Sequence, residues 1–369
     1  MATVPLLTSI YSAHAVNLEK VAAKLGNDAV PFLESIETRV TKLLNSMPKR
    51  TLSPQEVTAI RGEIDKITRE ELQAYTTQYK LDNKTVGMQQ AAFDAKTLEG
   101  VTANITASMP SAAAVNSMAV KTPISVGFGQ FNTYNRYVAN YWQQYTKVIN
   151  DTVAAGFIEG GTNREIAARI IESIALDVDD GDLAKAKRAA KTMARTGTNH
   201  YATQATVAFV DKNDEVLTGY RMISTLDNVT SRQCSALDQR VFKKDDPNIP
   251  WPPGHPNCRR RVIYEIDARF TFDDSASTRP SNFTDADGDR DPKRVTSKQI
   301  YYKEVKAMSA KDRNSLLGPQ LGPALAKMDF DTFAKSLIDK KTFEPLSIAD
   351  MKKKDDELGL ILKEQAKSK

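Results

Sequence analysis

Helical periodicity is the feature that most limits what this chain can fold into. Apolar residues recur every three or four positions over residues 16–44 and 54–79, a spacing that places them on one face of an α-helix. Gly26 and Pro31 are expected to divide the first run into two helices, because both residues disfavour a helix interior. The sequence Ser-Pro-Gln-Glu at 53–56 forms a capping box and predicts where the second run begins.

Two further segments are less regular. Residues 91–125 are rich in Ala, Thr, Ser and Met, a composition that fits either a weak helix or a flexible connector. After Pro123 we expect a helix whose large rings pack into a core rather than stack on nucleic acid. Its aromatic residues are Phe131, Tyr134, Tyr137, Tyr141, Trp142 and Tyr145.

Helical patterning continues over residues 162–210. Thr162 and Glu165 form a second capping box, which predicts a helix over 166–174. Asp182 is expected to cap the next helix, whose basic residues we interpret as a solvated face, with contact to double-stranded DNA as the alternative. The candidate DNA contacts are Lys185, Lys187, Arg188 and Lys191.

Strand signals are concentrated in a short part of the chain. Residues 215–225 and 261–266 are rich in β-branched and aromatic side chains, which favour extended backbone. The sequence therefore predicts a mainly α fold with a small α+β core.

The polar segment 271–297 is expected to be a flexible linker. Its alternating Asp residues suggest an EF-hand, but that motif requires Gly at its sixth loop position and Glu at its twelfth. Arg290 and Thr296 occupy those positions, so we reject a calcium loop. Three short helices are expected to follow, with Ser297, Ser309 and Ser347 as caps and Gly318 as a stop signal.

Composition narrows the class of protein. The chain has 369 residues, a formal net charge of +5 and two cysteines. The length predicts more than one structural unit, and the small cysteine count favours synthesis in a reducing compartment such as the cytoplasm. Since no run of about 18 apolar residues or secretory signal is present, we expect a soluble protein with no membrane contact.

The most specific stretch lies between the two strand signals. It contains Thr-Leu-Asp at 225–227, Cys234, Leu-Asp at 237–238, and Pro-Pro-Gly-His-Pro-Asn-Cys-Arg at 252–259. Prolines at 247, 250, 252, 253 and 256 stiffen the loop and help to hold its side chains in place.

This stretch resembles the Mu F-like family of phage head morphogenesis proteins. The resemblance extends over about residues 162–350, and Gln239 and Arg260 depart from the family pattern, where Gly and a further Cys are usual. We therefore divide the chain into an N-terminal helical region (1–120), a Mu F-like core (121–270), the linker (271–297) and a C-terminal helical region (298–369). The motif residues are Asp227, Thr230, Cys234, Asp238, Pro253, His255, Asn257, Cys258 and Arg259.

The resemblance implies a minor head protein that acts in head morphogenesis. Its implied location is the virion head near the portal, with assembly in the host cytoplasm. The implied partners are the portal protein and other head proteins, and a contribution to genome packaging or delivery would bring the protein close to DNA. A DNA-binding internal protein that is ejected with the genome is the alternative; Lys residues at 352–354 add to its candidate contacts.

Cys234, His255 and Cys258 admit three interpretations. They could supply three zinc ligands, with Asp238 or Asp227 as the fourth; the two thiols could form a disulfide; or they could pack as small buried groups while His255 hydrogen-bonds the loop. The third interpretation is favoured, so no cofactor is expected and zinc is the alternative.

A nuclease of the HNH type is a further alternative. His255 and Asn257, with Asp227 and Arg259 nearby, fit part of such a site, but its chemistry needs another metal-binding His or Asp. The other histidines, His14 and His200, lie in predicted helices. We therefore predict that the protein is not an enzyme.

Overall fold

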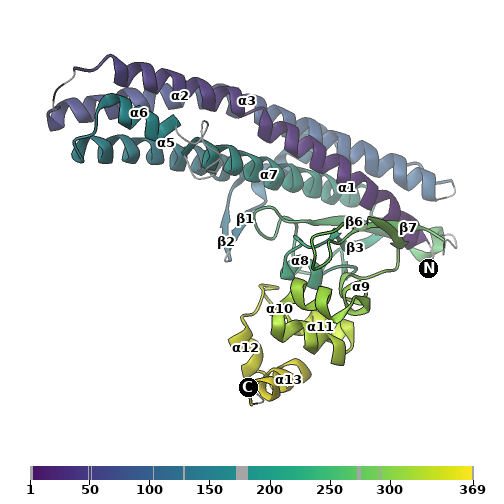
Figure 1. The fold of residues 1–369 in the computed structure, drawn as a ribbon. Helices are drawn as coiled ribbons and strands as arrows, with labels where there is room; N and C mark the ends of the chain where they lie inside the picture. Colours follow the sequence, from purple (N-terminus) through teal and green to yellow (C-terminus); the bar gives the residue numbers. More distant parts are fainter. Residues whose placement is uncertain are drawn as a thin grey trace.

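In the computed structural model, a long helical arm lies above a small sheet, and short C-terminal helices lie below the sheet (Figure 1). The structure describes residues 3–48, 50, 52–102, 104–127, 129–171, 182–271, 276–290 and 292–367. This arrangement confirms the predicted class, mainly α with a small α+β core. Among the helices described, none combines the length and the apolar character that crossing a membrane requires.

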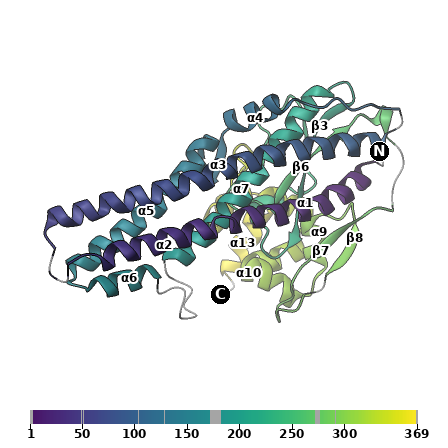
Figure 2. The same cartoon turned by 90° about the horizontal axis from the view of Figure 1, so that it is seen from above.

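The arm is built from helices that run along one another. α1 and α2 follow each other along its length, and α3 runs back beside them (Figure 2). Gly26 lies at the end of α1 and Pro31 in the first turn of α2, so the predicted division of the first helical run is confirmed. The arm consists of α1 (Thr3–Asn27), α2 (Val30–Asn45), α3 (Pro54–Val101), α4 (Ala112–Lys121), α5 (Tyr134–Ile158), α6 (Asn163–Ile171) and α7 (Asp182–Lys212).

Local signals fix several of these boundaries. Ser53 and Glu56 form the predicted capping box at the start of α3, and Thr162 and Glu165 exchange the same two hydrogen bonds at α6. α3 continues well beyond residue 79, because its later residues also pack against α7. Residues 91–125 thus include the end of one helix and the whole of another. The predicted cap at Asp182 concerns a side chain outside the described part of the chain.

A hairpin precedes α5. β1 (Ile124–Gly127) and β2 (Gln130–Asn132) pair antiparallel, so Phe131 belongs to a strand and is exposed rather than part of the aromatic helix. Thr133 caps α5. The prediction of rings packed in a core holds for Trp142 and Tyr145, which are buried.

Two three-stranded sheets lie below the arm. In the first, β3 (Leu217–Ser224) lies between β5 (Val241–Lys243) and β6 (Arg260–Ile266) and pairs antiparallel with both, so that Tyr220 faces Phe242 and Tyr264. In the second, β7 (Thr278–Asn282) pairs parallel with β4 (Leu226–Asp227) and antiparallel with β8 (Lys293–Thr296). The short helix α8 (Arg232–Ala236) and the 3₁₀ turn η1 (Ala268–Phe270) complete this part.

The predicted linker over 271–297 is wrong for the part of it that the structure describes. β7 and β8 form within it, and Arg279 and Ser281 of β7 are buried. Polar composition suggested mobility, but these polar groups find partners inside the fold, which removes the cost of burying them.

Within residues 298–367 the structure describes five helices rather than three: α9 (Tyr301–Ala307), α10 (Ala310–Lys327), α11 (Phe330–Ser336), α12 (Ile348–Lys353) and α13 (Glu357–Lys367). Ser309 and Ser347 cap α10 and α12 as predicted. Ile300 rather than Ser297 is the residue before α9. Gly318 has φ 84° and kinks α10 instead of ending it.

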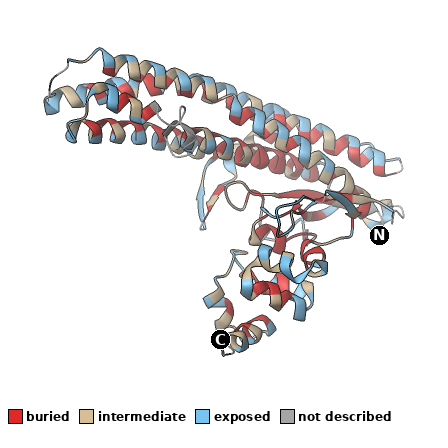
Figure 3. Cartoon of the chain, viewed as in Figure 1, coloured by how far each residue is buried: buried red, intermediate tan, exposed pale blue. Residues whose placement is uncertain are grey.

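The described residues form two large hydrophobic cores and two smaller clusters, and Figure 3 shows buried residues along the inner faces of the arm and on the sheet. The distal core lies in the arm and includes Leu33, Ile64, Tyr75, Trp142, Ile149 and Ile166. The proximal core joins the arm, the sheet and the C-terminal helices, and includes Leu7, Tyr11, Leu98, Phe209, Tyr220, Tyr264, Tyr302 and Phe333. Because α1, α3 and α7 contribute to both cores, residues 1–120 do not form a separate unit.

Candidate functional site

Three of the predicted motif residues, Cys234, His255 and Cys258, come together between α7, α8 and β6. Ser231 begins α8, where its hydroxyl accepts a hydrogen bond from the Cys234 amide at 3.2 Å. A serine at this position satisfies an amide that would otherwise lack a partner. The Cys234 carbonyl accepts a hydrogen bond of 2.7 Å from Ser224 at the end of β3. The Cys234 side chain is thus held on a short helix fixed at both ends.

Asn257 places the other half of the site. It has φ 58°, a left-handed conformation that Asn tolerates better than most residues. Its amide N–H donates to Thr196 and its side-chain amide to Thr192, both at 3.1 Å, while Arg195 donates to its side-chain oxygen. Asn257 therefore fastens the loop before β6 to one face of α7.

Cys258 is the next residue, and its backbone is held by hydrogen bonds with His255 and with Asn199 of α7. Its amide donates to the His255 carbonyl at 3.2 Å, closing a tight turn. Asn199 of α7 donates to the Cys258 carbonyl at 3.2 Å and to the Arg260 carbonyl at 3.1 Å. Pro253, whose bond to Pro252 is cis, precedes this turn.

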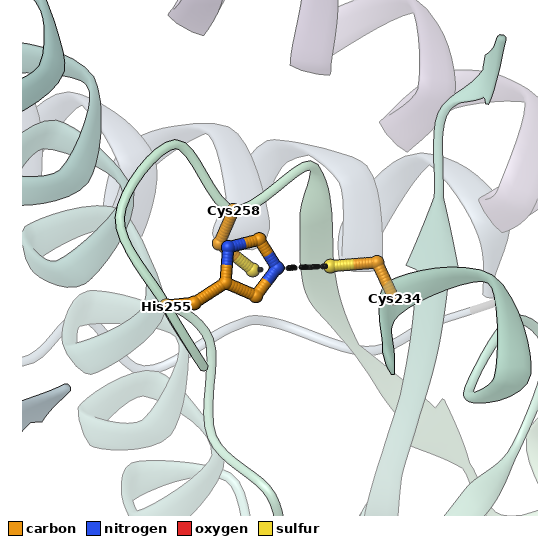
Figure 4. A group of neighbouring side chains, drawn as sticks. All are labelled: Cys234, His255 and Cys258. Carbon is orange, nitrogen blue, oxygen red and sulfur yellow. Dashed lines mark hydrogen bonds between the residues drawn. The ribbon is translucent and has the colours of Figure 1, made fainter. Parts of the chain in front are cut away.

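The three potential ligands meet at one point. Figure 4 shows the side chains of Cys234, His255 and Cys258 pointing toward one another. The Cys234 sulfur lies 3.2 Å from Nε2 of His255 and 3.5 Å from the Cys258 sulfur, and the three ligand atoms lie within 4.8 Å of one another. Both cysteines are free, since a disulfide would require a sulfur separation of about 2.05 Å.

The orientation of His255 is fixed by its second ring nitrogen. Nδ1 lies 2.8 Å from the Pro256 carbonyl, and a carbonyl can only accept, so Nδ1 carries the proton. In the neutral ring, Nε2 then presents a lone pair toward the thiols. The Ser231 hydroxyl lies 2.7 Å from Nε2 and places an oxygen beside the same group.

The two thiols differ in acidity. Burial raises the pKa of Cys234, but the hydrogen bond with Cys258 and the charge of Arg260 outweigh burial and bring that pKa to about 6. Burial and the Cys234 neighbour raise the pKa of Cys258 well above its usual value. Cys234 is therefore the thiol that ionises first. Because both cysteines are fully buried, neither can attack a substrate unless the site opens.

Asp238 is not a fourth ligand of this group, which corrects that part of the sequence prediction. Its carboxylate accepts from the Ser224 amide at 2.8 Å and the Tyr301 amide at 3.0 Å, and pairs with Arg279 at 3.2 Å. Burial raises the pKa of Asp238, and Arg279 opposes that rise. Its oxygens are fully engaged within the fold, and it lies outside the cluster of potential ligands found in the described residues.

Asp227 is occupied in a similar way. It accepts hydrogen bonds from Thr230 at 2.8 Å and from the Val229 amide at 3.2 Å, and forms an ion pair with Arg259. Tyr301 donates to its carbonyl at 2.9 Å. Asp227, Thr230 and Arg259 thus shape a turn rather than bind a metal.

Arg260 occupies the position where the resembled family often has a cysteine. Its side chain is fully buried and donates to the Pro250 carbonyl at 2.8 Å. Its Nε and one terminal nitrogen have no hydrogen-bond partner in the described part of the structure. The cluster is therefore limited to three protein ligands, with a cation beside it.

The remaining candidates lie apart from this site. Lys187 forms an ion pair of 2.9 Å with Glu34 on the arm, and Lys185, Arg188 and Lys191 share its helix and are exposed. This arrangement fits a solvated face.

The two histidines that a nuclease could recruit are held elsewhere. His14 stacks on Phe93, and the Nε2 atom of His200 lies 2.7 Å from the Ala119 carbonyl. Neither belongs to the ligand cluster found in the described residues, which weakens the nuclease interpretation.

Several residues that position the site were not identified from sequence. Asn199, Tyr301 and Arg279 each donate hydrogen bonds to its backbone or carboxylates. Arg279 lies in the polar segment that we interpreted as a linker. A lone Arg within a polar run carries no signal that it is buried, so local sequence patterns could not have identified it.

Comparison with protein-family models gives a match for the central part of the chain. Residues 147–263 match the family model described as Phage Mu protein F like protein. The match starts within α5 and ends within β6, so it includes the ligand cluster and covers less than half of the chain. Neither the curated proteins nor the solved structures gave a match.

Proposed function

Because residues 147–263 match the family model described as Phage Mu protein F like protein, we propose that the chain is a minor head protein that acts in head morphogenesis at or beside the portal. The observation that carries this proposal is the family match. The virion as its location and other head proteins as partners accord with the same match.

The shape of the molecule supports an assembly role. The matched region contains the ligand cluster, α6, α7 and the end of α5, and the remaining helices of the arm lie outside the match. A long helical arm braced on a small sheet offers an extended surface to neighbouring subunits. The two cysteines of the ligand cluster are buried, as suits a group that fixes structure rather than one that turns over a substrate.

Co-purification with the portal protein of the same phage tests the proposal. The full chain and the portal are co-expressed, isolated through a tag on the portal and weighed by native mass spectrometry. We expect a complex of defined ratio that persists through gel filtration. The portal of an unrelated phage serves as the control. If the full chain elutes free from its own portal while remaining folded, the portal role is wrong.

A role in genome packaging or delivery extends this proposal, since a protein at the portal stands beside the path of the DNA. Particles assembled without the protein are expected to form heads but to contain less DNA or to deliver it poorly. Normal DNA content with normal infectivity would remove this extension. Direct DNA contact through Lys185, Lys187, Arg188 and Lys191 would instead show as retention on duplex DNA that weakens steeply with salt.

We further propose that the protein has no catalytic activity. Nicking of plasmid DNA is the appropriate assay, with Mg²⁺ or Mn²⁺ present. Nicking by wild type that is lost in His255→Ala would restore the nuclease alternative, and absence of nicking in both supports a structural role.

A further inference from the structure

We propose that Cys234, His255 and Cys258 bind a zinc ion. The fourth ligand is the Ser231 hydroxyl or a solvent oxygen next to it. The ion would lie between α8, the loop that precedes β6, and α7. This inference goes beyond the assembly role and does not depend on it.

The distances suit a tetrahedral ion. Ligands at about 2.3 Å for sulfur and about 2.0 Å for nitrogen lie roughly 3.5–3.8 Å apart when arranged tetrahedrally. The observed separations are 3.5 Å between the two sulfurs and 3.2 Å between the Cys234 sulfur and Nε2 of His255. These two separations differ from the tetrahedral values by a few tenths of an ångström, and all three ligand atoms lie within 4.8 Å of one another. A disulfide would instead need the two sulfurs to approach to about 2.05 Å.

The histidine is already in the form that a metal needs. Ligating histidines usually donate their other ring N–H to a carbonyl or carboxylate, which orients the ring and leaves the ligating nitrogen unprotonated. His255 has this arrangement, with Nδ1 2.8 Å from the Pro256 carbonyl and Nε2 3.2 Å from the Cys234 sulfur. If His255 served only to stabilise the loop through the Nδ1 hydrogen bond, no sulfur would be needed next to Nε2.

The ligands are held in place without the ion. Ser231 fixes the start of α8, Asn199 holds the Cys258 carbonyl, and Asn257 fastens the loop to α7. Preorganisation of this kind lowers the entropy that binding must overcome. The fourth position faces the Ser231 hydroxyl, 2.7 Å from Nε2, so a solvent oxygen or the hydroxyl itself can complete the shell.

The donor set selects the metal and its role. Two thiolates with one imidazole favour zinc or copper(I) over calcium or magnesium. Both cysteines are fully buried. The ion would therefore have a structural role, cross-linking α8 to the loop before β6, rather than act as a Lewis acid on a substrate. Arg260 stands where the resembled family often has a further cysteine. That position therefore supplies no thiol, and the protein offers three ligands.

Metal content of the full chain is the first test. The protein is purified under reducing conditions without a metal-affinity tag, and zinc is measured by inductively coupled plasma mass spectrometry. We expect close to one zinc ion per chain, and its loss in Cys258→Ser and His255→Ala. Cys234→Ser should lose the ion as well. The matched control is Thr230→Ala, because Thr230 lies in the same neighbourhood, where it bonds Asp227, but contributes no ligand.

A second measurement covers the case in which the ligand variants do not fold. Wild type is stripped with a chelator and titrated with Co²⁺, whose thiolate charge-transfer band reports sulfur ligation, and thermal unfolding is followed with and without added Zn²⁺. We expect the band to appear at one equivalent and the melting temperature to rise with zinc. Folded wild type that holds no zinc and gives no cobalt band would overturn the proposal. So would a mass two daltons low from a disulfide, or zinc retained by the ligand variants.

Discussion

The two cores of this protein are stabilised by different chemistry. The distal core buries aliphatic and aromatic side chains between helices. The buried acidic and arginine side chains of the described residues instead lie in or beside the proximal core: Asp94, Asp227, Asp238, Arg260, Arg261, Arg279 and Glu304. Apolar packing accepts any side chain of suitable volume, whereas a buried charge requires its particular partner. The proximal core should therefore be the less tolerant of substitution.

The largest expected effect tests that difference directly. Arg279→Met leaves the Asp238 carboxylate buried without its cation, and we expect a loss of about 3–5 kcal/mol in the free energy of unfolding. Urea denaturation measures it. The control is Arg269→Met, whose exposed pair with Asp267 should matter little.

A double variant sharpens this prediction. Arg279→Met combined with Asp238→Leu removes both charges and should recover part of the lost stability, because no uncompensated charge is left buried. A double variant less stable than Arg279→Met alone would contradict this account of the pair.

The distal core should show graded behaviour. Ile64 is fully buried in α3, so Ile64→Ala should cost about 2–5 kcal/mol through the cavity it leaves. Ile64→Leu keeps the volume and should cost less than about 1.5 kcal/mol. Thermal unfolding followed by circular dichroism at 222 nm compares the two variants. Equal losses of stability would indicate that the distal core tolerates substitution no better than the proximal core.

The buried carboxyl of Asp94 predicts a pH dependence. Asp94 accepts hydrogen bonds from Gln90 at 2.7 Å and Thr206 at 2.8 Å and also bonds Tyr11. Burial raises its pKa to about 7, although these hydrogen bonds oppose the rise. The folded chain therefore binds the proton more tightly than the unfolded chain, so stability declines as pH rises from about 4 to 7.

Asp94→Asn should remove this pH dependence of stability, which amounts to about 4 kcal/mol for a shift of about three pKa units. The measurement is the difference between wild type and variant in the free energy of unfolding at several pH values. The contributions of the other titratable groups are common to both proteins and cancel in this difference. His200 has the opposite tendency, because burial lowers its pKa to about 4 and favours the folded chain at higher pH. A difference that does not change with pH would show that Asp94 is not protonated in the folded chain.

The smallest effect concerns the loop that holds the site. Asn257→Gly preserves the left-handed backbone but loses two side-chain hydrogen bonds with α7, at Thr192 and Arg195. We expect a loss of about 1–2 kcal/mol. Asn257→Ala should cost somewhat more, because alanine tolerates positive φ poorly. If both variants match wild type in chemical denaturation, the loop does not depend on this anchor.

Sequence patterns identified the parts of the site that are local. His255 and Cys258 are three residues apart, and their turn, together with Asn257, was visible in the motif. The error over Asp238 arose because a carboxylate near a thiol in sequence looks like a ligand. Its actual partner, Arg279, lies 41 positions away, and neither residue alone indicates the other.

The sequence by itself determined the helical class, the break between α1 and α2, the capping boxes at Ser53 and Thr162, and the identity of the matched region. These depend on residues within about one helical turn of each other or on a contiguous motif. Tertiary structure alone decided that α3 continues to Val101, that Thr278–Asn282 and Lys293–Thr296 form strands, and that Glu19 of α1 pairs with Arg195 and Arg261. The physical reason is that a buried polar side chain must find a hydrogen-bond or ion-pair partner. Which side chains are buried together depends on which distant segments the fold brings into contact.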